Sequence, residues 1–102
     1  MKNDKNSKKH VNDIKDFVLD FFKKDDIKIF LFGSRARGDA NLYSDIDIGI
    51  IPGKNFDRSK ITMLRGKIED LNIPNKIEIV NFSEVSAEFK QEALKGAVIW
   101  KD

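Results

Sequence analysis

The stretch LFGSRARGDANLYSDIDIGI, from Leu31 to Ile50, decides the fold. A glycine-serine turn interrupts its apolar residues, and Asp45 and Asp47 then alternate with isoleucines. Side chains two residues apart in a strand point to the same face, about 6.5–7 Å apart along the chain. The aspartates therefore share one face and the isoleucines share the other. A buried core explains the isoleucines, but aspartate is depleted in strands and needs another reason.

Paired carboxylates on one strand face repel each other unless a cation lies between them. At about 6.5 Å the repulsion is about 0.6 kcal/mol in water and about 2.5 kcal/mol at an effective dielectric constant of 20. Ligands that are all oxygen suit Mg²⁺, with Mn²⁺ as the alternative, and such an ion also takes oxygens from a substrate phosphate. The aspartate pair therefore predicts a magnesium site. The competing interpretation is a solvated polar face of an edge sheet.

Glu78 repeats the pattern on a later predicted strand, residues 76–82. Ile77 and Ile79 flank it, so Glu78 faces away from the isoleucines. If the two strands are neighbours, Glu78 lies on the same sheet face as the aspartate pair. Three carboxylates on two strands predict a site for two metal ions. For Glu78 alone, a solvated polar position is an equally good interpretation.

The glycine-serine turn offers the second half of a nucleotide site. Gly33 stops the preceding strand, and Ser34 begins a predicted single helical turn that Gly38 ends. A glycine lets a phosphate approach the backbone, and exposed N–H groups at a helix start bind anions. Arg35 and Arg37 add positive charge. Many Gly-Ser pairs are ordinary strand-ending turns, but beside a metal-binding pair this one predicts a phosphate cradle.

Helices and strands alternate along the rest of the chain. Apolar residues at three- and four-residue spacing predict helices, and short runs rich in β-branched and aromatic residues predict strands. The predicted helices cover residues 11–22 and 61–71, and a third helix, capped by Ser83 or Ser86, runs to Leu94. The predicted strands cover residues 27–32, 45–51, 76–82 and 97–100. In the last helix, Val85, Phe89 and Leu94 are expected to face inward. This order predicts an α/β (α+β) fold, a small mixed β-sheet flanked by helices.

Composition excludes several classes of protein. The chain has 102 residues, of which 40% are hydrophobic and 35% charged, as expected for one folded domain. No apolar run approaches the roughly 20 residues that cross a bilayer, and the N-terminus is too polar for a signal peptide. Without cysteine there is neither a disulfide framework nor a cysteine-ligated metal. We therefore expect a cytoplasmic protein with no membrane contact.

The first ten residues differ from the rest in charge. Residues 1–9 carry four lysines against one aspartate, whereas the remaining chain holds 15 basic and 16 acidic residues. We expect residues 1–10 to form a flexible lysine-rich tail, with His10 solvated at its end, and residues 11–102 to form a single domain. Nucleic-acid binders usually carry a basic face on the fold itself, so direct nucleic-acid binding is not the expected function.

The motifs together resemble the minimal nucleotidyltransferases, a family of the DNA polymerase β-like superfamily. Its signature is a Gly-Ser turn, a further glycine, an Asp-x-Asp motif and a third acidic residue on a later strand. The matching segments are Gly33–Gly38, Ser44–Asp47 and Ile77–Val80, and the resemblance covers roughly residues 11–100. At the third acidic position the family usually has aspartate, where this chain has Glu78. The resemblance implies the nucleotidyltransferase (polymerase β-like palm) fold.

The resemblance also implies an activity and a partner. A nucleoside monophosphate would pass from ATP or another nucleoside triphosphate to a hydroxyl, with release of pyrophosphate. The expected nucleoside monophosphate is AMP. Asp45 and Asp47 would hold two Mg²⁺ ions, Glu78 would help one ion activate the hydroxyl, and Gly33 and Ser34 would bind the β- and γ-phosphates. Minimal members are often encoded beside an all-helical HEPN toxin. They act as antitoxins, by adding AMP to the toxin or by binding it.

Two rival interpretations stay open. In the first, the same fold is catalytically weak or inactive and neutralises a partner by contact, so Asp45→Asn and Asp47→Asn would leave function intact. In the second, the chain is a nucleic-acid-binding module that uses its lysine tail. That interpretation predicts steep salt dependence and loss of binding when residues 1–9 are deleted.

Overall fold

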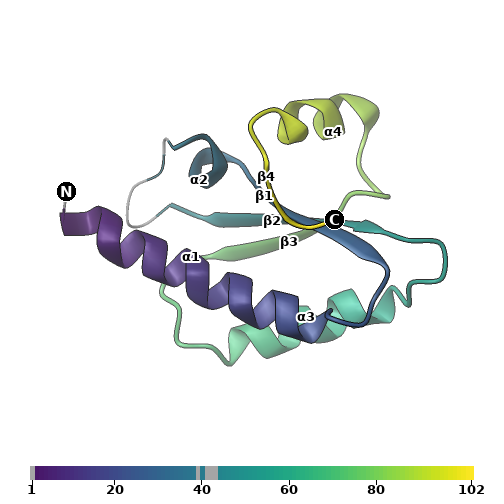
Figure 1. The fold of residues 1–102 in the computed structure, drawn as a ribbon, viewed down its shortest axis with the longest axis horizontal. Coiled ribbons are helices and arrows are strands. Elements are labelled where there is room, and N and C mark those ends of the chain that lie inside the picture. Colours follow the sequence, from purple (N-terminus) through teal and green to yellow (C-terminus); the bar gives the residue numbers. More distant parts are fainter. Residues whose placement is uncertain (1, 39, 41–43) are drawn as a thin grey trace.

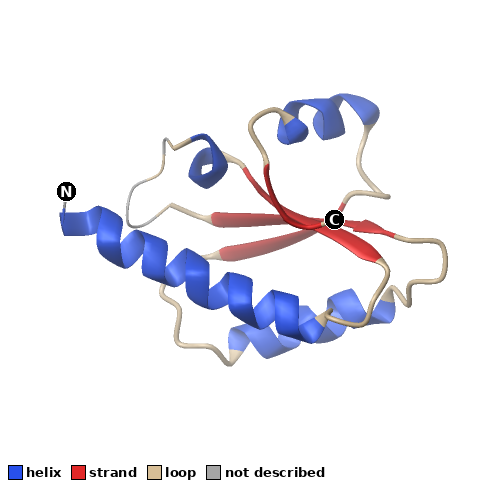
Figure 2. Ribbon diagram, in the orientation of Figure 1, coloured by secondary structure: helices blue, strands red, loops and turns tan. Residues whose placement is uncertain are grey.

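The protein folds as a four-stranded mixed sheet with helices on both faces (Figure 1, Figure 2). The computed structural model describes residues 2–38, 40 and 44–102, with side chains from residue 8 onward. The elements are α1 (Lys2–Phe21), β1 (Ile27–Phe32), α2 (Ser34–Arg37), β2 (Ile46–Pro52), α3 (Ser59–Glu69), β3 (Ile77–Asn81), α4 (Ala87–Leu94) and β4 (Val98–Lys101). The strand order is β3-β2-β1-β4, with β1 antiparallel to both its neighbours and β2 parallel to β3. The expected mixed α/β architecture is confirmed.

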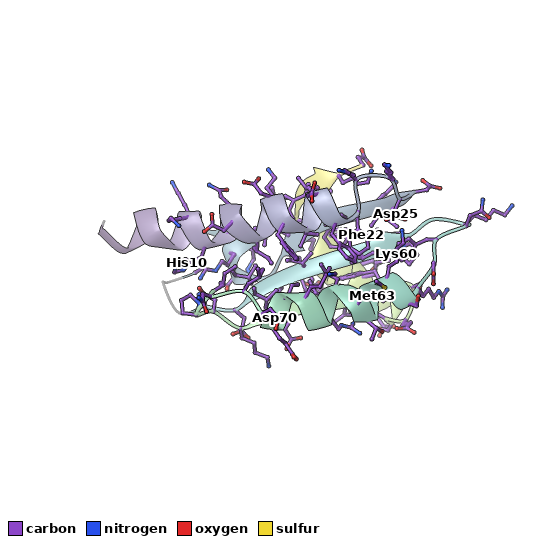
Figure 3. All side chains as sticks on the ribbon, turned by 90° about the horizontal axis from the view of Figure 1, so that it is seen from below. His10, Phe22, Asp25, Lys60, Met63 and Asp70 are labelled. Carbon is purple, nitrogen blue, oxygen red and sulfur yellow. The ribbon has the colours of Figure 1, made fainter. Side chains whose placement is uncertain are left out.

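One face of the sheet carries the main core. Alternate side chains of β1, β2 and β3 are buried there, among them Ile29, Ile48 and Ile79. Helices α1 and α3 lie side by side over this face, as Figure 3 shows, and contribute Val18 and Leu64. This burial of every second residue is what the sequence pattern predicts for strands with one covered face.

The opposite face carries a second, aromatic cluster. Phe30, Phe32 and Phe82 are buried there, with ring centroids 4.8 to 5.9 Å apart. Phe89 of α4 packs against them, its ring centroid 5.7 Å from that of Phe82. A Cβ on Gly49 would collide with the Phe30 ring, so the glycine in β2 makes room for the cluster. This cluster anchors α4 beside the face that also bears the acidic residues.

Helix α1 begins at Lys2, where a flexible tail over residues 1–10 was expected. No glycine or proline separates Lys2 from the amphipathic segment that starts at Val11, so the helix continues toward the N-terminus. His10 is half-buried on this helix, and its Nδ1 has no hydrogen-bond partner among the described residues. Neither α1 nor any other helix in the described part of the chain is long and apolar enough to cross a membrane.

Helix α4 is less buried than its sequence predicts. Ser86 caps it, its Oγ accepting a hydrogen bond of 3.1 Å from the Phe89 N–H. Val85 packs against the aromatic cluster as expected. Phe89 and Leu94, however, are 45% and 39% exposed, so their predicted inward orientation is wrong in part. The helix has only eight residues and packs on a small cluster, which leaves no second layer to cover these side chains.

Candidate active site

The three acidic residues come together where β2 and β3 begin. These strands are parallel neighbours, and their register pairs Asp47 with Glu78. Asp45 directly precedes β2 and alternates with Asp47, away from the buried Ile46. Asp45 is exposed, whereas Asp47 and Glu78 are partly buried. The structure therefore places Glu78 beside the aspartate pair, as its strand position predicts when the two strands are neighbours.

Gly33 connects the glycine-serine turn to this acidic cluster. Its φ of 76° and ψ of −157° lie in a region that is essentially restricted to glycine. A Cβ at this position would collide with the Asp47 Oδ2. The contact follows from the antiparallel register, which pairs Phe32, the last residue of β1, with Asp47. The predicted phosphate cradle, Gly33 and Ser34, thus begins directly against the predicted metal ligand.

The pKa of the Asp47 carboxyl is raised by its surroundings. Burial raises the pKa of its carboxyl above the ordinary value, and the negative charges of Asp45 and Glu78 raise it further. Lys76 and Arg37 act in the opposite direction. Like charges raise a carboxyl pKa in this way only when they lie close together. Asp45 and Glu78 therefore each lie near enough to Asp47 to repel its carboxylate, and a cation placed beside Asp47 would relieve that repulsion.

Lys76 is a member of this cluster that sequence reasoning missed. Its Nζ lies 2.9 Å from the Glu78 Oε1, and the hydrogen bond and charge of Glu78 raise the pKa of Lys76. The signal was present in the sequence, because residues two apart in a strand share a face. The sequence pattern predicts Lys76 only as the first residue of the third strand.

The two arginines of the turn lie on different sides. Arg37 interacts electrostatically with Asp47, on the carboxylate face. The Arg35 guanidinium instead donates to the Ser44 carbonyl, at 2.9 Å from one nitrogen and 3.3 Å from another. Asn75, which is buried, donates to the same carbonyl at 3.1 Å. Arg35 and Asn75 thus fix the backbone just before Asp45, a supporting role that the sequence did not reveal.

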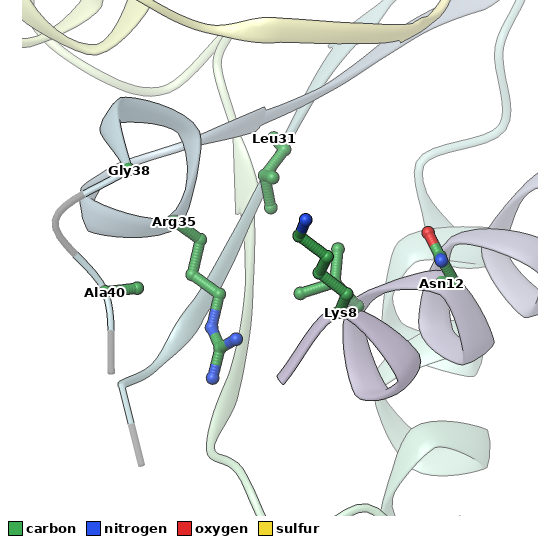
Figure 4. A pocket seen from close by; sticks show the side chains of 7 residues that line it. Lys8, Asn12, Leu31, Arg35, Gly38 and Ala40 are labelled. Atoms are coloured by element: carbon green, nitrogen blue, oxygen red, sulfur yellow. The ribbon is translucent and has the colours of Figure 1, made fainter. Parts of the chain in front are cut away.

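A cavity of about 400 Å³ lies behind the turn, on the α1 side (Figure 4). Lys8 and Asn12 of α1, Leu31 of β1 and Arg35 of α2 line it. Leu31 belongs to the main core, so this cavity opens on the face opposite the carboxylates. The side chain of Arg35 lines this cavity, and its guanidinium donates to the Ser44 carbonyl.

The donor chemistry of the cluster fits a divalent cation. Three carboxylates on adjacent strands are the oxygen ligands that Mg²⁺ or Mn²⁺ takes. As the side chains stand, no three acidic or histidine residues within 2–38, 40 and 44–102 gather tightly enough to enclose one ion. Lys76 engages the carboxylate of Glu78 instead. The residues fit the ion by donor type, and the strand register places Glu78 beside Asp47.

Comparisons with known proteins identify the family of this chain. The family model described as polymerase beta, nucleotidyltransferase matches residues 12–102. The probable protein adenylyltransferase MntA of Haemophilus influenzae is 27% identical over 74 residues, which cover 72% of this chain. The match spans 65% of the length of that relative.

Solved structures share the fold. A toxin–antitoxin pair crystallised with AMP-PNP superposes with a TM-score of 0.64 at 19% identity, over 84% of this chain and 71% of that chain. A variant of the toxin–antitoxin pair MntA-HpeT gives a TM-score of 0.62 at 16% identity, over 84% and 70% of the two chains. The resemblance to the minimal nucleotidyltransferases is confirmed, and the chain belongs to the polymerase beta nucleotidyltransferase family.

Proposed function

We propose that this chain transfers AMP from ATP to a hydroxyl group on a partner protein, with Mg²⁺ as cofactor. The observation that carries the proposal is the meeting of three elements at one point. Asp47 pairs with Glu78 across β2 and β3, and the Asp47 carboxylate lies against Gly33 of the glycine-serine turn. A metal-binding cluster and a phosphate-binding turn are the two parts that nucleotidyl transfer needs. The family membership and the name of the bacterial relative support it.

The proposed step is an in-line displacement at phosphorus. The acceptor hydroxyl oxygen forms a bond to the α-phosphorus of ATP, and the bond from that phosphorus to the β-phosphate oxygen breaks. Pyrophosphate leaves with the bonding electron pair, and the hydroxyl proton passes to the Glu78 carboxylate and from there to water. When bound, Mg²⁺ supplies charge neutralisation of the triphosphate and lowers the pKa of a coordinated hydroxyl.

The residues of this chain have distinct roles in the proposal. Asp45 and Asp47 would hold the two Mg²⁺ ions, and Glu78 would complete the ligand set of one ion and receive the proton. Gly33 and Ser34 bind the β- and γ-phosphates through the backbone N–H groups and hydroxyl at the start of α2. Arg37, already within electrostatic reach of Asp47, is the arginine placed to neutralise phosphate charge. Arg35 keeps a structural role through Ser44.

The proposed acceptor is a small helical toxin of the HEPN type, which makes this chain a cytoplasmic antitoxin. Two toxin–antitoxin complexes with the same fold support a protein partner. The second candidate function is neutralisation by contact, without transfer.

The test is transfer of label from ATP radiolabelled at the α-phosphate, with Mg²⁺, in a lysate of the native host. Wild type is compared with Asp47→Asn and with Asp16→Asn, which removes an exposed carboxylate on α1. The proposal expects one labelled protein with wild type and with Asp16→Asn, and none with Asp47→Asn. Removal of Mg²⁺ with EDTA should abolish the label in every reaction.

The outcomes separate the candidates. Equal labelling by wild type and Asp47→Asn would contradict the assignment of the site. Absence of label with all three proteins, together with unchanged toxin neutralisation by Asp47→Asn, would favour the contact function.

A further inference from the structure

We propose that Lys76 is a built-in counter-cation of the acidic cluster, which competes with a divalent metal for Glu78. The inference rests on the proposed function, since it concerns the same carboxylates. It adds a residue that tunes how tightly the site holds its metal.

The geometry places Lys76 within the cluster. The Ile46 N–H donates to the Lys76 carbonyl at 2.9 Å, which extends the β2–β3 ladder to this position. Lys76 and Glu78 are two residues apart, so their side chains share the face of the aspartates. The Lys76 Nζ lies 2.9 Å from the Glu78 Oε1. The metal ligand nearest the open edge of the sheet is therefore already paired.

The charge of Lys76 extends beyond Glu78. Glu78 contributes most to the raised pKa of Lys76, with Asp45 and Asp47 adding smaller effects in the same direction. The ammonium thus occupies the position beside the Glu78 carboxylate, 2.9 Å from its Oε1. A divalent ion that uses Glu78 must displace it, or accept a like charge beside itself.

Lys76 is suited to be displaced. Its side chain is 67% exposed and that of Glu78 is 43% exposed, so the pair is one that solvent weakens. A compact ammonium on a flexible stem can leave without moving the backbone. Arg35, by contrast, donates two hydrogen bonds to the Ser44 carbonyl and supports the chain there. Lys76 therefore sets the metal concentration at which the site fills, and does not hold the fold.

The experiment is a titration of the full chain with Mn²⁺ alone, without nucleotide, read by the electron paramagnetic resonance of the free ion. The variants are Lys76→Gln, which removes the charge, and Lys76→Arg, which keeps it. Lys54→Gln is the matched control, because Lys54 is an exposed lysine just beyond the far end of β2. Circular dichroism verifies that each variant is folded.

We expect Lys76→Gln to bind Mn²⁺ about twofold to fivefold more tightly than wild type, the range of a partly exposed ion pair. Lys76→Arg and Lys54→Gln should bind as wild type does. In a Glu78→Gln background, the gain from Lys76→Gln should shrink, because the contested carboxylate is gone.

Each contrary result has its own meaning. Equal or weaker Mn²⁺ binding by Lys76→Gln would overturn the role of Lys76 and leave the proposed function standing. An undiminished gain in the Glu78→Gln background would also overturn it, since the competition would not be for Glu78. No Mn²⁺ binding by any variant would overturn the metal site of the proposed function, and this inference with it.

Discussion

Gly33 is the residue on which the geometry of the site depends most. Replacement by alanine is strained twice, because its φ and ψ lie in a glycine-only region and a Cβ would collide with the Asp47 Oδ2. We expect Gly33→Ala to lower the free energy of unfolding by about 1–3 kcal/mol for the backbone alone. It should also lower ATP-dependent label transfer at least tenfold, since Asp47 must move. Urea unfolding and the transfer reaction measure the two effects.

Gly38 provides the matched control for this change. It also has a positive φ, 83°, but a Cβ there would meet no atom within 4 Å among the described residues. Gly38→Ala should therefore cost about 1–2 kcal/mol of stability, for the left-handed conformation only. Its label transfer, measured on the folded fraction, should stay near that of wild type. Equal loss of transfer in both variants would show that the collision with Asp47 is unimportant.

The raised pKa of Asp47 predicts a pH dependence of stability. Burial is its main cause, followed by the charges of Asp45 and Glu78, so the folded state holds the proton more tightly than the unfolded chain. Stability from this group is therefore present at low pH and is lost as the pH rises through the folded pKa. In EDTA at neutral pH, the free energy of unfolding of Asp47→Asn should be higher than that of wild type, by no more than about 1 kcal/mol because solvent screens the site. Below about pH 3.5 the advantage should vanish.

Urea unfolding at the two pH values, with Asp16→Asn as the exposed-carboxylate control, measures this difference. The Asp16→Asn curve should follow that of wild type at both values. A constant offset between wild type and Asp47→Asn at all pH values would mean that the Asn side chain, and not the lost charge, changes the stability.

Among the elements, β2 shows how one strand supports both the core and the site. Its middle residue, Gly49, leaves space for the Phe30 ring, and the Phe82 ring would lie 2.7 Å from an added Cβ. We expect Gly49→Ala to destabilise the fold by about 1–3 kcal/mol through overpacking. Gly66, inside α3, has no atom within 4 Å of an added Cβ among the described residues. Gly66→Ala should therefore stabilise by about 0.5–1 kcal/mol. Thermal denaturation of the two variants tests the contrast, and equal signs would contradict it.

Elements with a strong local sequence pattern could be predicted, whereas features that depend on tertiary packing could not. Strong local patterns were sufficient for β1, predicted with its observed bounds, and for the helical turn between Gly33 and Gly38. The start of α1 could not be predicted, because the lysine-rich residues before Val11 carry no apolar periodicity and no helix breaker. The exposure of Phe89 depends on how little of the sheet α4 covers, which is a tertiary property.

The parts of the site that depend on the alternation of side chains along one strand could be predicted. The parts that depend on contacts between distant segments could not. Asp45 and Asp47 share a face by strand geometry alone, and only the β2–β3 register brings Glu78 beside them. The use of Arg35 to hold the Ser44 carbonyl depends on a loop path that no local pattern encodes. A basic residue near a predicted phosphate site therefore had two equally plausible roles, and the tertiary structure distinguishes them.

For the whole molecule, the main core and the carboxylates lie on opposite faces of the sheet. The isoleucine face lies under α1 and α3 and forms the main core, and the opposite face bears the carboxylates. Ligand binding and core packing should therefore contribute independently to the free energy of unfolding. Contributions from sites that share no partner are usually additive.

Addition of Mg²⁺ with the ATP analogue AMP-PNP tests this independence. At about a hundredfold excess over the dissociation constant, the complex should unfold at a free energy about 2.7 kcal/mol higher than the free chain. Ile48→Val, a change in the fully buried core, should lower the stability of the free chain by about 0.5–1.5 kcal/mol and leave the ligand increment unchanged. Without ligand, the double variant Asp45→Asn with Asp47→Asn should be at least as stable as wild type, because the repulsion around Asp47 is removed, and it should lose the ligand increment. Thermal shift with and without ligand measures all three proteins, and an increment that falls in Ile48→Val would mean that the core and the site are coupled through the sheet.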